Sequence, residues 1–175
     1  MTQFPKALLL SIRLIDAITA WSGERVRWLI IPLVGVLSYE VFARYLFNAP
    51  TVWAFEITYM LYGSHFMLGA AYALYEGAHI RTDIFYSRFP VRWQGVIDAA
   101  LYVFLFFPGI LLFLVVGWEE AVESWRILER SDASTWRPPL YPLKTVIPVA
   151  ALLLLIQAVS EFLKSLYAVA RGERL

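Results

Sequence analysis

Three ionisable residues lie where the first two apolar stretches of the sequence meet, close to Pro50. Arg44 precedes Pro50 by six residues, and Glu56 follows it by six. In a helical hairpin that turns at Pro50, both side chains lie at a matching depth, about 9 Å below the turn. Glu40 stands four residues before Arg44, the favourable order for an ion pair on one helix face. Arg44 therefore has two candidate carboxylate partners.

This cluster has two interpretations. Ionisable groups inside a membrane span are the first candidates for a site that couples protons or substrate. Alternatively, Arg44 and its two acids form an ion-pair lock between the first two helices, because an unpaired charge there is costly. We favour the lock, since two acids around one permanently charged arginine are each harder to protonate.

The two histidines of the chain do not form a haem site. His65 falls inside a predicted span, and His79 lies 14 residues further on, past the end of the same helix. This spacing corresponds to about 21 Å along a helix, so the pair cannot bracket one haem. Because His65 follows Gly63 and Ser64, we expect it to form a hydrogen bond at a close helix contact rather than to act as a ligand.

The remaining polar residues suggest no catalysis. The densest polar run on the predicted inner side, residues 77–83, contains no paired acids, no Ser/His arrangement and no phosphate-binding glycine loop. We expect an intracellular turn there. The sequence has no cysteine, which excludes disulfides, thiolate metal sites and cysteine nucleophiles. We therefore predict no enzymatic activity, no catalytic residue, no metal site and no cofactor.

The elements that position these residues follow from composition. Hydrophobic residues make up 60% of the chain and charged residues 17%, against roughly 45–50% and about 25% in soluble domains. The apolar residues form long runs, which is typical of membrane spans. A net charge of +1 gives no reason to expect nucleic acid as a partner. The sequence predicts an all-α integral membrane protein, a single membrane domain over residues 1–175.

We predict four transmembrane helices and one N-terminal interfacial amphipathic helix. Asn48, Ala49 and Pro50 mark the first turn, Gly77 ends the second helix, and Pro108 predicts a kink in the third. Beyond Gly117 the third helix either projects into water or breaks and lies at the surface, which leaves 118–137 as an outer segment. The predicted spans are 26–47, 52–76, 95–117 and 143–166, and the interfacial helix covers 4–22.

The N-terminal helix is expected to be amphipathic. At 100° per residue, Lys6, Arg13, Asp16 and Glu24 fall within an arc of about 80°. The rest of its surface is aliphatic, aromatic or Ser/Thr. This pattern favours a helix in the cytoplasmic interface, and the alternative is a helix packed against the protein's own bundle.

The distribution of Lys and Arg predicts the orientation. With both termini inside, ten basic residues lie on the cytoplasmic side and five outside, which satisfies the positive-inside rule. The inner set is Lys6, Arg13, Arg25, Arg27, Arg81, Arg88, Arg92, Lys164, Arg171 and Arg174, and the outer set is Arg44, Arg126, Arg130, Arg137 and Lys144.

An ordered set of residues resembles a known family. The set resembles the small membrane subunit (Q, or DctQ-like subunit) of tripartite ATP-independent periplasmic (TRAP) transporters over about 40 residues, and the four-helix plan extends the resemblance to the whole chain. The matching residues are Arg44-Tyr45-Leu46-Phe47-Asn48-Ala49-Pro50, Trp53, Glu56, Gly69-Ala70-Ala71, Glu76-Gly77, His79-Ile80-Arg81 and Asp83.

The resemblance implies a bacterial inner-membrane protein with two partners. A large M subunit carries the solute and sodium sites, and a periplasmic binding protein delivers the solute, typically an organic acid. The small subunit is expected to act as a scaffold in membrane lipid. Because the chain ends nine residues after Leu166, we expect Q and M to be separate polypeptides. The residues expected to have structural or interaction roles are Glu40, Arg44, Trp53, Glu56, His65, His79, Arg81 and Asp83.

The outer segment carries an acidic cluster formed by Glu119, Glu120 and Glu123. We expect it to help dock the binding protein, through electrostatic guidance; the alternative is a solvated amphipathic surface. Two other functions stay open for the chain as a whole. One is a small proton-coupled drug antiporter, which would use a membrane glutamate, and the other is a membrane assembly factor without a transport role.

Overall fold

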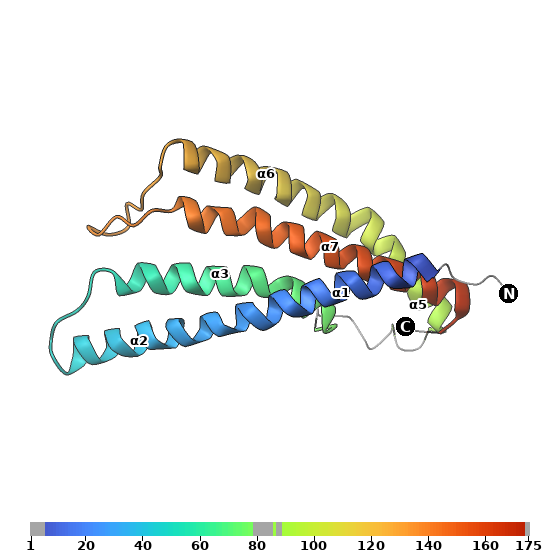
Figure 1. Cartoon of the computed structure of the whole chain (residues 1–175), viewed down its shortest axis with the longest axis horizontal. Coiled ribbons are helices and arrows are strands. Elements are labelled where there is room, and N and C mark those ends of the chain that lie inside the picture. The colour runs from blue at the N-terminus through green and yellow to red at the C-terminus, as the bar shows by residue number, and fades with distance from the viewer. Residues whose placement is uncertain (1–5, 79–85, 87–88, 174–175) are drawn as a thin grey trace.

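The computed structural model describes residues 6–78, 86 and 89–173. Within these ranges the chain is helical, and its helices form two long hairpins (Figure 1). Three helical stretches are long and apolar enough to cross a membrane, namely Leu8–Tyr45, Val91–Arg126 and Tyr141–Arg171. The fourth predicted span, α3 (Ala54–Tyr75), is a 22-residue helix that does not satisfy the same measure of apolarity.

The first 40 described residues form one continuous helix instead of two. Helix α1 (Lys6–Val26) passes through a single turn of 3-10 helix, η1 (Arg27–Leu29), into α2 (Ile30–Tyr45). The expected separation between residues 22 and 26 is absent. The Ser22 hydroxyl donates back to the carbonyl oxygen of Thr19 at 2.9 Å, a bond that is compatible with helix continuation.

Helix α1 also packs against the bundle, on α3 and α7 (Tyr141–Arg171). Ile12, Thr19 and Gly23 are buried on its inner face. The structure therefore does not confirm a separate interfacial helix over residues 4–22, and it agrees with the alternative in which this segment packs on the protein itself. Leu10, Leu14, Ile18 and Trp21 remain exposed on the opposite face.

The first turn forms as its sequence predicts. Asn48 adopts a left-handed conformation with φ 50°, which asparagine tolerates better than most residues. The amide of Ala49 donates to the carbonyl of Ala43 at 2.9 Å and satisfies the end of α2. At the far end of α3, Gly77 has φ 67° and terminates the helix, again as predicted.

The third predicted span is part of a 36-residue helix. It consists of α5 (Val91–Leu101), a π-helical turn η2 (Tyr102–Phe106) and α6 (Phe107–Arg126). The π turn ends just before Pro108, which lacks an N–H and would collide with a carbonyl one turn earlier; the wider turn accommodates it. Gly117 is buried and does not break the helix. The predicted alternatives beyond Gly117 are a continuous helix and a break, and the structure has a continuous helix as far as Arg126.

The last helix joins the two halves of the molecule. Helix α7 begins at Tyr141 with Pro142 in its first turn and ends at Gly172, which has φ 73°. It packs against α6 and α5 and also against α3 and α1. In Figure 1 the α2–α3 and α6–α7 hairpins meet at the end that holds both termini and diverge towards their turns. The two hairpins are therefore joined at one end.

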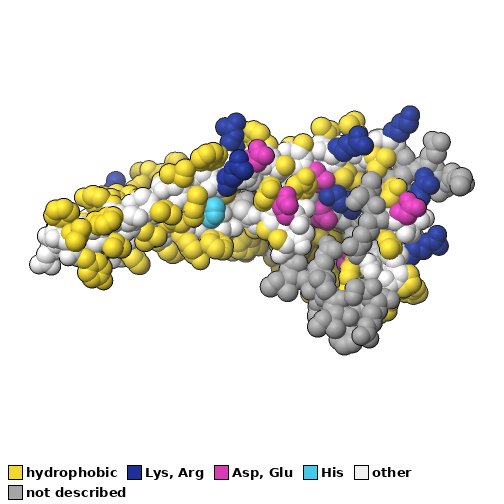
Figure 2. All heavy atoms as spheres, turned by 90° about the horizontal axis from the view of Figure 1, so that it is seen from below, with side chains coloured by type: hydrophobic (Ala, Val, Ile, Leu, Met, Phe, Trp, Pro, Cys, Tyr) yellow, Lys and Arg dark blue, Asp and Glu magenta, His cyan; other side chains and the backbone are white. Residues whose placement is uncertain are grey.

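Small residues fill the interior, and large apolar residues cover the surface. The buried apolar residues are mostly alanines, such as Ala54, Ala71, Ala151 and Ala158. Figure 2 shows hydrophobic side chains covering the end that carries the α2–α3 turn, whereas charged side chains gather over the other half. This distribution is expected of a chain whose surface faces lipid or protein rather than water.

Gly117 provides a test of the α6–α7 contact. A Cβ atom at this position would lie 2.7 Å from Cγ2 of Ile147, whereas a Cβ at Gly109 on the same helix would meet nothing within 4 Å. We expect Gly117→Leu to destabilise the purified chain by about 1–3 kcal/mol, as overpacking does. Gly109→Leu is the matched control. Equal melting temperatures for the two variants in detergent would contradict the close contact.

Candidate functional site

The structure brings Arg44 to Glu40 but not to Glu56. The Arg44 guanidinium contacts Oε1 of Glu40 at 2.5 Å, and its side chain is 53% exposed. Glu56 lies in the first turn of α3 and is 3% exposed. Among the described residues, Glu40 is the only ion-pair partner of Arg44. The predicted three-residue lock between helices is therefore reduced to a pair within α2.

Glu40 has a second role that the sequence did not reveal. Its Oε2 accepts hydrogen bonds from the backbone amide of Thr51, at 3.1 Å, and from the Thr51 hydroxyl. Trp53 lies near the same turn and stacks on Tyr39 of α2, with ring centroids 5.6 Å apart. Glu40 thus ties α2 to the turn, and Arg44 holds the Glu40 carboxylate in position.

Glu56 is a buried acid without a complete set of partners. Its Oε1 atom has no hydrogen-bond partner among the described residues. Its predicted cation, Arg44, is turned to Glu40 instead. A buried carboxylate of this kind is costly, and such residues in membrane proteins are functional candidates.

His65 forms the predicted kind of contact. Its Nδ1 lies 3.3 Å from the carbonyl oxygen of Val26, at the junction of α1 and η1. A hydrogen bond to this carbonyl, which can only accept, requires the hydrogen on Nδ1. His65 thereby links α3 to the long first helix. His79, Arg81 and Asp83 lie outside the described residues.

A polar network that the sequence did not predict joins α1 to α7. Asp16 accepts hydrogen bonds from Ser160 at 2.7 Å and from Gln157 at 3.1 Å, and it contacts the Lys164 ammonium at 2.9 Å. Lys164 also contacts Glu161 at 2.7 Å. Gln157 is 0% exposed. The signal available in the sequence was Gln157, Ser160, Glu161 and Lys164 within an otherwise apolar stretch, but their partner lies more than 140 positions away.

The outer acidic cluster is partly neutralised. Glu120 contacts Lys144 at 3.2 Å, and Glu123 contacts Arg126 at 3.5 Å. Lys144 also contacts Glu129 at 2.7 Å, and its ammonium holds the pKa of the Glu129 carboxyl below the usual range. Glu119 is exposed. The cluster therefore presents less negative charge than its three acids suggest.

The loop that follows the cluster is ordered by backbone hydrogen bonds. The amide of Ser131 donates to Pro138, and the amide of Leu140 donates to Glu129, both at 2.9 Å. Arg137 contacts Asp132 at 2.7 Å across the loop. The outer segment is thus a fixed surface between α6 and α7.

Within the described residues, no group of three or more His, Cys, Asp or Glu side chains is arranged to hold a metal ion. Open grooves among these residues include one between α1 and α3 and another, almost entirely apolar, between α6 and α7. Two ion pairs connect helices among the described residues, Asp16 with Lys164 and Glu120 with Lys144.

Comparison with known proteins gives one family. The family model described as the DctQ component of tripartite ATP-independent periplasmic transporters matches residues 33–167. The match begins within α2 and ends within α7, so α1 and Asp16 lie outside it. No curated protein matches the chain significantly.

The network between α1 and α7 can be tested by a double-mutant cycle. Lys164→Met leaves Asp16 and Glu161 without their cation. We expect a loss of about 1–3 kcal/mol, less than the roughly 3–5 kcal/mol of a fully buried pair, because these side chains stay partly exposed. Asp16→Asn combined with Lys164→Met should recover part of this loss.

Melting of the detergent-purified chain measures these changes. Lys6→Met, which removes an exposed cation from α1, is the control and should change stability by no more than about 0.5 kcal/mol. Strictly additive effects of the Asp16 and Lys164 substitutions would show that the two residues are not coupled.

Proposed function

Because the chain belongs to the DctQ family, the small membrane component of tripartite ATP-independent periplasmic transporters, we propose that it is a static scaffold for the large membrane subunit of such a transporter. The transporter would take up an organic acid, driven by sodium and supplied by a periplasmic binding protein. The match over residues 33–167 is the observation that carries this proposal.

The arrangement of side chains supports a scaffold. Large apolar residues are exposed along both hairpins, for example Phe66 on α3 and Phe104 beside α6. Such surfaces need lipid or another membrane protein to cover them. Asp16 and Lys164 are held in an ion pair that connects α1 to α7. A chain built in this way suits a fixed support better than a moving carrier.

The outer segment suits a docking role for the binding protein. Its loop is held by backbone hydrogen bonds, so it offers a fixed surface. Glu119 is exposed, while Glu120 and Glu123 are paired with basic neighbours. Docking there would therefore depend on the shape of the loop together with a mixture of charges.

One observation favours a second candidate, the small proton-coupled antiporter. Such a protein needs a membrane acid that can take up a proton, and Glu56 is buried with one carboxylate oxygen unpartnered. Arg44 does not neutralise it. The two functions differ in whether the chain transports anything without a partner.

Reconstitution into liposomes distinguishes the two functions. We expect the purified chain alone to give no solute-dependent flux, and to co-purify with a large multi-span membrane protein. Glu56→Gln should leave assembly with that protein intact and should not change the coupling of uptake to ions. Proton-coupled flux of a hydrophobic cation by the chain alone, abolished by Glu56→Gln, would support the antiporter.

We further propose that the chain lies in the inner membrane with both termini in the cytoplasm. The chain has no native cysteine, so a single introduced cysteine shows on which side of the membrane its position lies. Ser131 is only 5% exposed and is unsuitable as a reporter, whereas Thr135 and Glu173 are exposed. An impermeant thiol reagent added outside intact cells should label Thr135→Cys and not Glu173→Cys. The opposite pattern would invert the orientation.

A further inference from the structure

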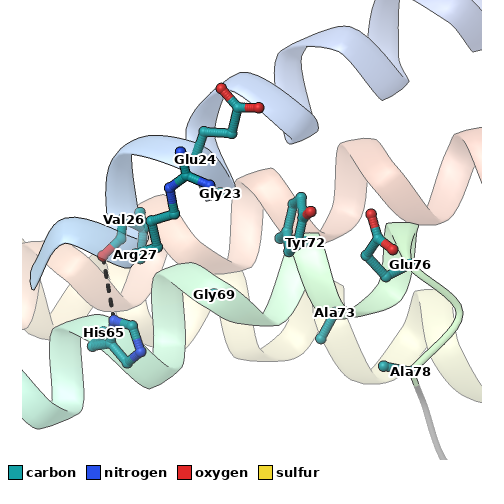
Figure 3. Close-up of a pocket in the computed structure, with 10 residues that line it drawn as sticks. All are labelled: Gly23, Glu24, Val26, Arg27, His65, Gly69, Tyr72, Ala73, Glu76 and Ala78. Atoms are coloured by element: carbon teal, nitrogen blue, oxygen red, sulfur yellow. Dashed lines mark hydrogen bonds between the residues drawn. The ribbon is translucent and has the colours of Figure 1, made fainter. Parts of the chain in front are cut away.

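A groove between α1 and α3 has the features of a binding site for one amphiphilic molecule. Its volume is about 380 Å³, and its lining is largely apolar with a few polar groups. Gly69 lines the groove, and a Cβ atom there would meet nothing within 4 Å, so a side chain at this position would project into open space. Figure 3 shows Glu24 and Arg27 on the α1 side of the groove and Tyr72 and Glu76 on the α3 side.

The charged rim of the groove lies at one boundary of the membrane. From η1 the chain runs through α2 to the turn, and α3 returns over 22 residues, about 33 Å. This length matches a hydrocarbon core of about 30 Å. Trp21 and Trp28 are exposed on either side of the rim, with Arg25 and Arg27 over their rings. Tryptophan and arginine are typical of the lipid headgroup level.

The rim has a defined charge pattern. Arg27 has no carboxylate within ion-pair distance among the described residues, and its interaction there is with the Trp28 ring, 5.8 Å away. Its guanidinium is thus available to bind a phosphate. Glu24 and Glu76 supply two carboxylates. The residues that line the groove therefore combine one cation with two anions.

We propose that this groove binds a phospholipid with a protonated amine headgroup, of the phosphatidylethanolamine type. Arg27 would bind the phosphate, Glu76 and Glu24 the ammonium, and an acyl chain would lie along Gly69 and Ala73. The net negative charge of the groove lining disfavours an anionic lipid such as phosphatidylglycerol, because that headgroup brings a phosphate without a compensating ammonium. This inference concerns the chain's own lipid and goes beyond the scaffold function.

Native mass spectrometry of the full chain tests the lipid assignment. The delipidated protein is titrated with phosphatidylethanolamine and with phosphatidylglycerol that carry the same acyl chains. We expect the first lipid to bind about tenfold more tightly, a difference comparable to one charge-assisted hydrogen bond. Equal affinities for the two lipids would show that the groove binds lipid without headgroup preference and would overturn the proposal. Preference for phosphatidylglycerol would also overturn it.

Two glycines of α3 give a matched pair of variants. Gly69→Leu fills the groove, whereas Gly63→Leu adds the same side chain in open space outside it. We expect Gly69→Leu to weaken phosphatidylethanolamine binding about tenfold and Gly63→Leu to leave it unchanged. Unchanged binding by Gly69→Leu would show that the lipid lies elsewhere.

The two exposed rim residues separate the headgroup contacts. Arg27→Gln should weaken the binding of both lipids, because both headgroups carry the phosphate. Glu76→Gln should weaken the binding of phosphatidylethanolamine alone. The ratio of the two lipid affinities should therefore become smaller. If Glu76→Gln leaves the preference unchanged, the ammonium contact is absent and the proposed headgroup is wrong.

Discussion

The polar contact between the first and last helices is the constraint on which the arrangement of the molecule depends. Asp16 accepts hydrogen bonds from Gln157 and Ser160, which are both fully buried, and pairs with Lys164. A polar group in such surroundings is costly unless its partners are supplied by the protein. The contact therefore fixes α1 across α7. Because α1 continues into α2, it also fixes the first hairpin relative to the second at one end.

Small residues allow the helices to meet at the remaining crossings. Gly117 lies against Ile147 where α6 crosses α7, and Gly95 lies against the backbone of Ser165 where α5 crosses it. Close backbone approach of this kind provides much of the packing between membrane helices. The large apolar side chains are consequently left on the outside, where they face lipid or another protein. This distribution suits a subunit whose role is to present a surface.

In the first hairpin, a matching depth along two helices does not make two charged side chains partners. Arg44 and Glu56 are equally distant from Pro50 in the sequence, but Arg44 is exposed and pairs with Glu40 within its own helix. Glu40 in turn holds the turn through Thr51. A partner on the same helix, one turn away, needs no particular packing of α3. Glu56, on α3, is buried, and its Oε1 atom has no hydrogen-bond partner among the described residues.

The sequence alone determined the features that depend on neighbouring residues. These are the all-helical membrane character, the turn at Asn48, the end of α3 at Gly77 and the hydrogen bond that His65 forms at a helix contact. The tertiary structure decided the continuity of residues 6–45 and 91–126, the choice of partner for Arg44, and the network between Asp16 and α7. The physical reason is that hydropathy and capping act within a few residues. The rotation of one helix against another, which selects the partner of a charge, is fixed by packing between segments that are far apart in the chain.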